Sequence, residues 1–164
     1  MWRRALLLLV LPLLTASAPL PALSFPGIDH IVVEKAARRM TLYGVGGTAH
    51  VITGVQLGGQ PVGPKRFQGD RRTPEGRFVI DYGNDRSAFH LSLHISYPRA
   101  EDVALARASG RSPGGDVFIH GQPDAWPAGR VPGDWTDGCI AVSDEEIEAL
   151  WEAVGDGTPI EIRP

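Results

Sequence analysis

The chain has 164 residues, enough for one domain with a sizeable core, and a formal net charge of −3. This slightly acidic balance gives no support for nucleic-acid binding, because proteins that bind nucleic acids gather Lys and Arg on one face. The 20 glycines and 14 prolines favour a turn-rich, mostly β domain.

The N-terminus has the pattern of a secretory signal peptide. Two arginines near the start precede an apolar run at residues 5–14, and Ala-Ser-Ala at residues 16–18 offers a cleavage site. The run is shorter than the roughly 20 residues of a membrane-spanning helix, so we expect no stable membrane span after cleavage; an uncleaved anchor is the alternative. We predict a signal peptide at 1–18 and an exported domain at 19–164, in the periplasm or cell envelope.

The first half of the mature chain is predicted to form short strands between turns. Residues 31–47 give two apolar runs around Lys35–Arg39, which indicates a hairpin. Residues 49–59 favour the next strand. A loop rich in Gly, Pro and basic residues follows; it contains a Thr-Pro-Glu-Gly turn at residues 73–76, and a strand resumes at 78–80.

Residues 89–97, FHLSLHISY, alternate between apolar and polar side chains, which predicts a strand with one buried face. Its two histidines, His90 and His94, are four residues apart, so on a strand they are separated by about 13 Å. That is too far for one zinc ion, and we expect no metal site. For His94, two interpretations stay open: it faces a substrate cleft, or it is a surface or hydrogen-bonded residue.

Two helices are predicted. Residues 98–110 favour a short helix that begins near Pro98 and stops at Gly110. Ser143 and Glu146 form a capping box for a second helix, whose apolar stripe consists of Ile147, Leu150, Trp151 and Val154. A final short strand follows at residues 158–164. The expected fold is therefore a single, compact, mostly β (α+β) domain with one capped helix and one further short helix.

Cys139 is the only cysteine of the chain, which is unusual for an exported protein. A strand-like run, DVFIH, ends at His120, and Gly138 precedes the cysteine as part of a tight turn. An imidazole can take the proton of a thiol and so make it a nucleophile. The alternatives are a buried cysteine that acts as a small hydrophobe beside a structural histidine, or an intermolecular disulfide.

The joint pattern is more specific. His120-Gly121, a gap, Thr136-x-Gly138-Cys139, a capped helix and GTPIEI resemble the YkuD-type L,D-transpeptidase catalytic domain. The similarity extends upstream through RTPEG and FHLSLHISYP, segments that resemble a murein transpeptidase subgroup.

The resemblance implies a site. Cys139 would be the nucleophile and His120 its general base and later acid, with the Gly121 carbonyl orienting the imidazole. Backbone N–H groups around Gly138 and Cys139 would form the oxyanion hole. The implied reaction releases D-alanine from a peptidoglycan tetrapeptide stem and makes 3→3 cross-links, without a cofactor. Alternatives on the same fold are an L,D-carboxypeptidase, an amide hydrolase that releases wall-bound protein, and a non-catalytic wall-binding module.

Two positions depart from the family pattern. Many members have His or Lys where this chain has Asp137, and many have Arg or Asn where it has Ala141. The second departure removes a side chain that could contact substrate.

Two further segments have open interpretations. The loop between His120 and Cys139 carries Trp126 and Trp135, which either form a lid over the nucleophile or simply pack. The central loop either meets substrate carboxylates or is solvated, and we favour the second; its cations are Lys65, Arg66, Arg71, Arg72 and Arg77.

Overall fold

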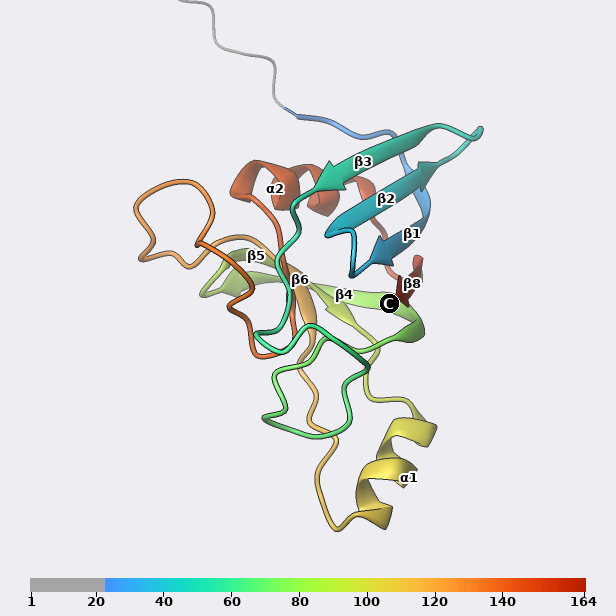
Figure 1. The fold of residues 1–164 in the computed structure, drawn as a ribbon. Helices are drawn as coiled ribbons and strands as arrows, with labels where there is room; N and C mark the ends of the chain where they lie inside the picture. The colour runs from blue at the N-terminus through green and yellow to red at the C-terminus, as the bar shows by residue number, and fades with distance from the viewer. Residues whose placement is uncertain (1–22) are drawn as a thin grey trace, which may run out of the picture.

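The computed structural model describes residues 23–164, and the predicted signal peptide lies outside the described residues. These residues form one curled eight-stranded sheet and two helices, in the strand order β3-β2-β1-β8-β4-β5-β6-β7 (Figure 1). The predicted mostly β class is therefore confirmed. The strands are β1 (Ile28–Glu34), β2 (Arg39–Gly44), β3 (Ala49–Thr53), β4 (Gly76–Ser87), β5 (His90–Ile95), β6 (Phe118–His120), β7 (Ile140–Ala141) and β8 (Pro159–Arg163); the helices are α1 (Ala100–Ala108) and α2 (Asp144–Ala153). Within residues 23–164, neither helix is long and apolar enough to cross a bilayer.

The predicted hairpin is present. β1 and β2 pair antiparallel, with Val33 opposite Met40 and Arg38 at a positive φ of 49° in the turn. β8 then inserts between the hairpin and the rest of the sheet, parallel to β1 and antiparallel to β4. The last strand of the chain is therefore central in the sheet, and it joins the hairpin half to the half that carries β5, β6 and β7.

The second helix begins at the predicted capping box. The Ser143 hydroxyl accepts a hydrogen bond from the Glu146 N–H at 3.2 Å, and the Glu146 carboxylate accepts one from the Ser143 N–H at 2.8 Å. Ile147 and Leu150 are fully buried, and α2 packs on β5 and β6. Burial of each such side chain contributes about 1.5–3 kcal/mol. The predicted stripe therefore anchors α2 directly behind the strand that ends at His120.

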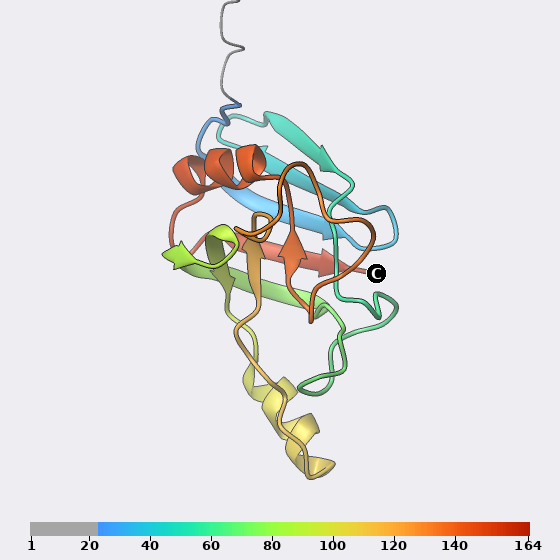
Figure 2. The ribbon, with the colours of Figure 1, turned by 90° about the vertical axis from the view of Figure 1, so that its left-hand side faces the viewer.

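The first helix lies far from the second. α1 projects from the end of the molecule opposite to α2 and the β1–β3 strands (Figures 1 and 2). Its N-terminus is held by Arg99, whose N–H and guanidinium both donate to the Asp102 carboxylate, at 3.0 and 2.9 Å. Ala106 is its one buried residue, so α1 buries little of its surface against the rest of the domain.

The alternation predicted for β5 holds on its apolar face, where Leu93, Ile95 and Tyr97 are buried. Its polar face is not uniformly exposed, since Ser92 is 3% exposed. The cause is the antiparallel neighbour β6, in which His120 lies opposite Ser92. One polar stretch of β5 therefore faces the site described next.

Candidate active site

Two neighbouring strands bring His120 and Cys139 together. β6 ends at His120, and β7 begins directly after Cys139; the two strands pair in parallel, with His120 opposite Ala141. Both side chains line one hollow of about 310 Å³, whose wall includes Phe89, Asp116 and Phe118. The two side chains, with eighteen residues between them in the sequence, thus lie on one side of the sheet.

The turn that presents the thiol is closed by Thr136. The Thr136 hydroxyl accepts from the Gly138 N–H at 3.1 Å and donates to the Cys139 carbonyl at 2.8 Å. Gly138 has a φ of +137°, and a Cβ there would lie 2.6 Å from the Arg72 carbonyl oxygen. Only glycine fits such a position. Because the Gly138 N–H already has an acceptor, it is not directed into the hollow, and the N–H of Cys139 is the remaining one of the two expected oxyanion donors.

The thiol of Cys139 contacts the backbone that leads into β6. Its Sγ accepts from the Phe118 N–H at 3.4 Å and lies 3.6 Å from the Asp116 carbonyl oxygen. Burial raises the pKa of the Cys139 thiol, which the Phe118 N–H and the Lys65 ammonium lower in part. The resting group is therefore a protonated thiol that needs a base.

The imidazole of His120 is enclosed and oriented. Its ring lies 4.6 Å from that of Phe89 and 5.7 Å from that of Trp135, between centroids, and the residue is 3% exposed. Nδ1 lies 2.7 Å from the Gly121 carbonyl oxygen. Since a carbonyl only accepts, Nδ1 carries the hydrogen and Nε2 keeps its lone pair. Burial lowers the pKa of His120, against the effect of the Gly121 bond, so the ring is a neutral base at pH 7.

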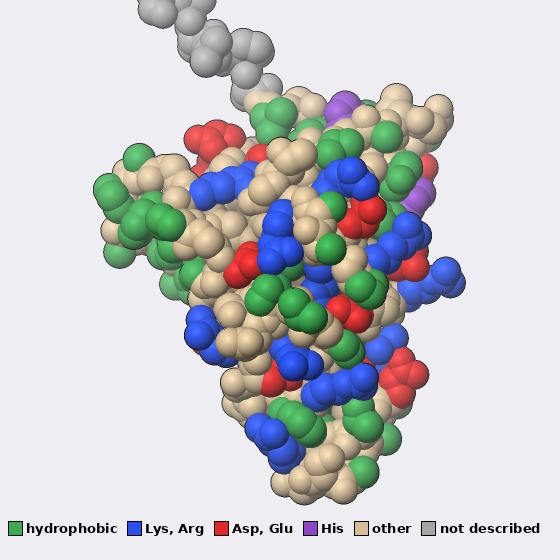
Figure 3. Space-filling model, in the orientation of Figure 1, with side chains coloured by type: hydrophobic (Ala, Val, Ile, Leu, Met, Phe, Trp, Pro, Cys, Tyr) green, Lys and Arg blue, Asp and Glu red, His purple; other side chains and the backbone are tan. Residues whose placement is uncertain are grey.

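The segment between the two residues is fastened at several points. Gln122 is buried and donates to the Val142 carbonyl at 2.5 Å, and the Asp134 carboxylate accepts from the Leu57 N–H at 2.9 Å and pairs with Arg38. The two tryptophans have different environments. Trp135 packs on His120, whereas Trp126 is 40% exposed. Hydrophobic side chains gather on the projecting loop of this segment (Figures 1 and 3).

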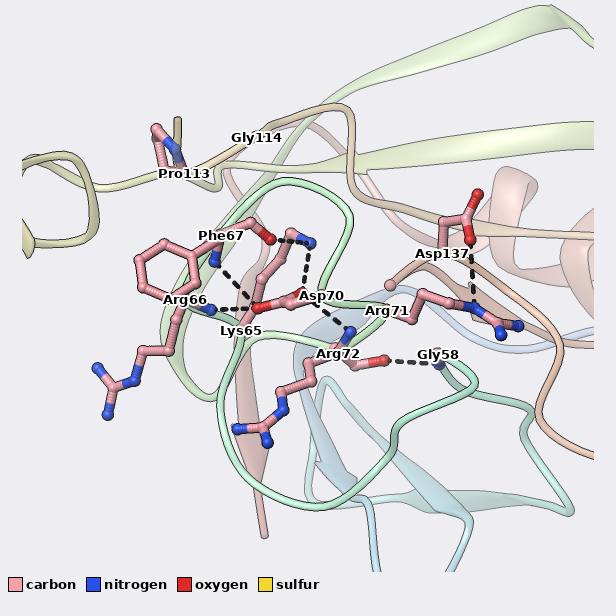
Figure 4. Close-up of polar contacts among 12 residues, drawn as sticks. Gly58, Lys65, Arg66, Phe67, Asp70, Arg71, Arg72, Pro113, Gly114 and Asp137 are labelled. Atoms are coloured by element: carbon pink, nitrogen blue, oxygen red, sulfur yellow. Dashed lines mark hydrogen bonds and ion pairs between the residues drawn. The ribbon is translucent and has the colours of Figure 1, made fainter. Parts of the chain in front are cut away.

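A second hollow of about 430 Å³ borders the same turn. It is lined by the charged residues Lys65, Arg71, Asp116 and Asp137, together with Gln68 and three glycines. Asp116 belongs to both hollows, and it has a positive φ of 54°, which Asp tolerates better than most residues. Figure 4 shows the loop of residues 65–72 and its contacts beside Asp137. The Cys139 turn is thus flanked by two hollows.

The other candidate residues lie apart from the thiol. His94 contacts Asp81 at 2.6 Å and His90 contacts Glu148 at 2.8 Å, and neither histidine lines a hollow with Cys139. Across residues 23–164 no group of three potential metal ligands occurs. Ala141 is fully buried and exchanges two backbone hydrogen bonds with Gln56.

Sequence reasoning missed several residues of the site: Phe89, Ser92, Asp116 and Phe118. The alternation of residues 89–97 predicts Phe89 on the apolar face of a strand, but Phe89 precedes β5, whose first residue His90 has a φ of +67°. This irregular backbone leaves Phe89 out of the alternating face, and its ring packs on His120. The positive φ of Asp116 has no sequence signal beyond two preceding glycines.

The comparisons agree with this geometry. A family model described as the YkuD L,D-transpeptidase catalytic domain matches residues 28–162. The chain therefore belongs to the YkuD family, and the resemblance inferred from the sequence is confirmed. A search of curated proteins finds no significant match.

Solved structures share the fold. The helical cell shape determining protein Pgp2 from Campylobacter jejuni is 20% identical, with a TM-score of 0.65 over 86% of this chain and 50% of that one. L,D-transpeptidase 1 from Mycobacterium tuberculosis is 18% identical, with a TM-score of 0.52 over 84% of this chain and 62% of that one. The chain thus spans about half the length of Pgp2, and at these identities the similarity is one of fold.

Proposed function

We propose that this protein is an exported, cysteine-dependent peptidoglycan L,D-transpeptidase. Its donor substrate is a tetrapeptide stem, and its product is a 3→3 cross-link. The observation that carries the proposal is the position of Cys139, whose half-buried thiol shares a hollow with the neutral His120 and whose turn borders a second hollow. An acyl transfer between two peptides needs a place for each of them beside one nucleophile.

In the first half-reaction, Nε2 of His120 takes the thiol proton as Sγ of Cys139 attacks the carbonyl carbon of the third stem residue. The negative charge that forms on the carbonyl oxygen is stabilised by the N–H of Cys139. The C–N bond to D-alanine then breaks, and the imidazolium gives its proton to the leaving amine. The product is a thioester on Cys139.

In the second half-reaction, the side-chain amine of a neighbouring stem attacks the thioester. His120 takes a proton from the incoming amine and returns it to the sulfur as the C–S bond breaks. The second hollow suits this acceptor, because Asp116 and Asp137 place carboxylates there that attract the amine while it is protonated and Arg71 offers a guanidinium for its carboxylate. The bound amine loses this extra proton to water before its lone pair attacks. The residues named supply each other proton transfer, and no cofactor takes part in the proposed steps.

Tetrapeptide muropeptides incubated with the mature protein test the proposal, with products read by mass. The control is Cys139→Ser, which keeps the size of the side chain and weakens the nucleophile. Cross-linked dimers that lack one D-alanine, absent with the variant, are the expected result. Monomers that merely lose D-alanine would identify an L,D-carboxypeptidase. Unchanged muropeptides in both samples would favour another wall bond or a binding module.

Export has its own test. Expression of the full chain in a bacterium with an envelope should yield a mature protein that begins at residue 19, as measured by intact mass. A mass that retains the first residues would instead indicate the uncleaved anchor.

A further inference from the structure

Lys65 is a buried cation in the central loop, although the sequence favours a solvated loop there. The residue is 5% exposed, and its Nζ lies 3.0 Å from the Asp70 carboxylate and 3.2 Å from the Phe67 carbonyl oxygen (Figure 4). Burying an ammonium is unfavourable unless it is paired, and even paired it seldom adds net stability over an apolar residue. The position of this charge therefore calls for a reason other than packing.

Asp70 holds the loop of residues 65–72 in one shape. Its carboxylate accepts backbone hydrogen bonds from Arg66 at 2.6 Å, Phe67 at 3.0 Å and Arg72 at 3.1 Å, besides the bond from Lys65. Burial opposes its charge, but these donors together hold the pKa of Asp70 below its ordinary value. The Lys65 ammonium is thus fixed in place by a loop that is itself closed around a carboxylate.

This loop packs directly on the turn that presents the nucleophile. A Cβ on Gly138 would lie 2.6 Å from the Arg72 carbonyl oxygen and 3.5 Å from Nζ of Lys65. The ammonium thus lies within van der Waals contact of that added Cβ. The charge therefore lies beside the residue that immediately precedes Cys139.

The other charged groups around the thiol differ in sign and position. Asp137, on the same turn, and Asp116, before β6, oppose formation of a thiolate, and His120 is buried and neutral. Arg71 pairs with Asp137 at 3.5 Å and Arg86 lines the His120 hollow; both are exposed.

Against these groups, Lys65 is the buried cation that favours negative charge on Cys139. Its effect is stronger than that of an exposed charge, because little water screens it.

We propose that Lys65 is a positioning residue whose ammonium lies against the Gly138 turn and acts across it on Cys139. Its ammonium stabilises the negative charge that forms on Sγ of Cys139 as the thiol proton leaves, and Asp70 fixes this ammonium and moderates its strength. The inference rests on the proposed nucleophilic role of Cys139. It assigns a function to the charge of Lys65 beyond its contribution to the loop.

Alkylation of the folded protein by iodoacetamide tests the inference without any peptidoglycan substrate. Because Cys139 is the only cysteine, the alkylation rate against pH reports on this thiol alone. Lys65→Met should move the midpoint of the rate profile upward by about one pH unit, as expected for loss of a nearby opposite charge. Lys65→Arg, which keeps the charge, should restore at least half of that shift.

Asp70→Asn separates an electrostatic role from a structural one. It removes the negative charge that moderates Lys65, so the midpoint should move downward. Damage to the loop would instead move both variants in the same direction. The inference is overturned if the midpoints of Lys65→Met and Asp70→Asn move in the same direction. It is also overturned if the midpoint of Lys65→Met is unchanged while its near-ultraviolet circular dichroism shows a native fold. If Lys65→Met does not fold, the sign of the shift in Asp70→Asn decides, and an upward or absent shift overturns it. Failure of transpeptidation alone leaves these midpoints unaffected.

Discussion

Nδ1 of His120 donates a hydrogen bond to the carbonyl oxygen of Gly121, the next residue in the chain, at 2.7 Å. The imidazole is thus oriented by the main chain rather than by a carboxylate. A neutral carbonyl supports the imidazolium less than an Asp would, and burial disfavours that charged form further. The imidazole is therefore neutral at neutral pH and becomes charged only at a free-energy cost.

This cost predicts a dependence of stability on pH. Burial lowers the pKa of His120 in the folded state, whereas the unfolded residue titrates near the ordinary value of about 6.5. Below that pH the unfolded chain binds more protons, so the free energy of unfolding falls as pH decreases. His120→Gln should flatten this slope in urea denaturation between about pH 7.5 and 5.5. The matched variant of an exposed histidine, His30→Gln, should keep it. Equal slopes in all three proteins would contradict the assignment.

Phe89 is expected to influence the pKa of the His120 imidazole. Its ring lies 4.6 Å from that of His120 and excludes water from one face of the imidazole. Phe89→Ala would hydrate the ring and raise the pKa of His120 toward its ordinary value. The acid limb of kcat/KM for the proposed release of D-alanine should therefore move to higher pH. Phe25→Ala removes an aromatic partner of His50 instead and should leave the limb in place.

Gly138 is predicted to tolerate no side chain. Gly138→Ala combines the strain of a positive φ with a Cβ 2.6 Å from a backbone oxygen, so we expect a loss of about 3 kcal/mol or more in the free energy of unfolding. Gly129→Ala is the control, because Gly129 also has a positive φ, of 67°, but no atom within 4 Å of the added Cβ. The free energy of unfolding of Gly129→Ala should fall by only about 1 kcal/mol, as measured by chemical denaturation. Similar losses in the two variants would show that the contact with Arg72 does not constrain the turn.

Much of the fold could be predicted because its signals are local. The hairpin at Lys35–Arg39, the capping box of Ser143 and the final strand each depend on neighbours within a few residues. The parallel pairing of β1 with β8 joins Val33 to Ile162, and no local pattern specifies such a partner. The order of the strands therefore became visible only in the structure.

The candidate site also has a part that the sequence predicts and a part that it does not. Cys139 and His120 belong to a motif with a defined spacing, and the structure brings them to one hollow. For the central loop, the sequence leaves substrate contact and solvation open and favours solvation. The carboxylate of Asp70, five residues after Lys65, accepts four hydrogen bonds, one of them from the Lys65 ammonium. Lys65 is therefore buried, whereas Arg66 and Arg71 are exposed. Composition describes the loop as a whole, but burial depends on which single side chain has a partner.

Gln56 should control the segment that covers His120. It is 6% exposed; its amide donates to the Val131 and Gly133 carbonyls, and its oxygen accepts from Gln122 at 3.1 Å. Gln56→Leu keeps the approximate volume but leaves these groups without their partner, so we expect a loss of about 2 kcal/mol in urea denaturation. Cleavage between residues 123 and 135 should also become faster in limited proteolysis, because the segment loses its attachment to the sheet.

The control for that experiment is Gln60→Leu, at an exposed position four residues further along the same stretch. It changes hydropathy equally but removes no buried hydrogen bond, so stability should stay within about 0.5 kcal/mol of the wild type. Since Trp135 packs on His120 at the end of this segment, a loosened segment should also raise KM for the proposed tetrapeptide substrate more than it lowers kcat. A variant that loses stability while KM stays constant would show that the attachment serves folding and not the shape of the hollow.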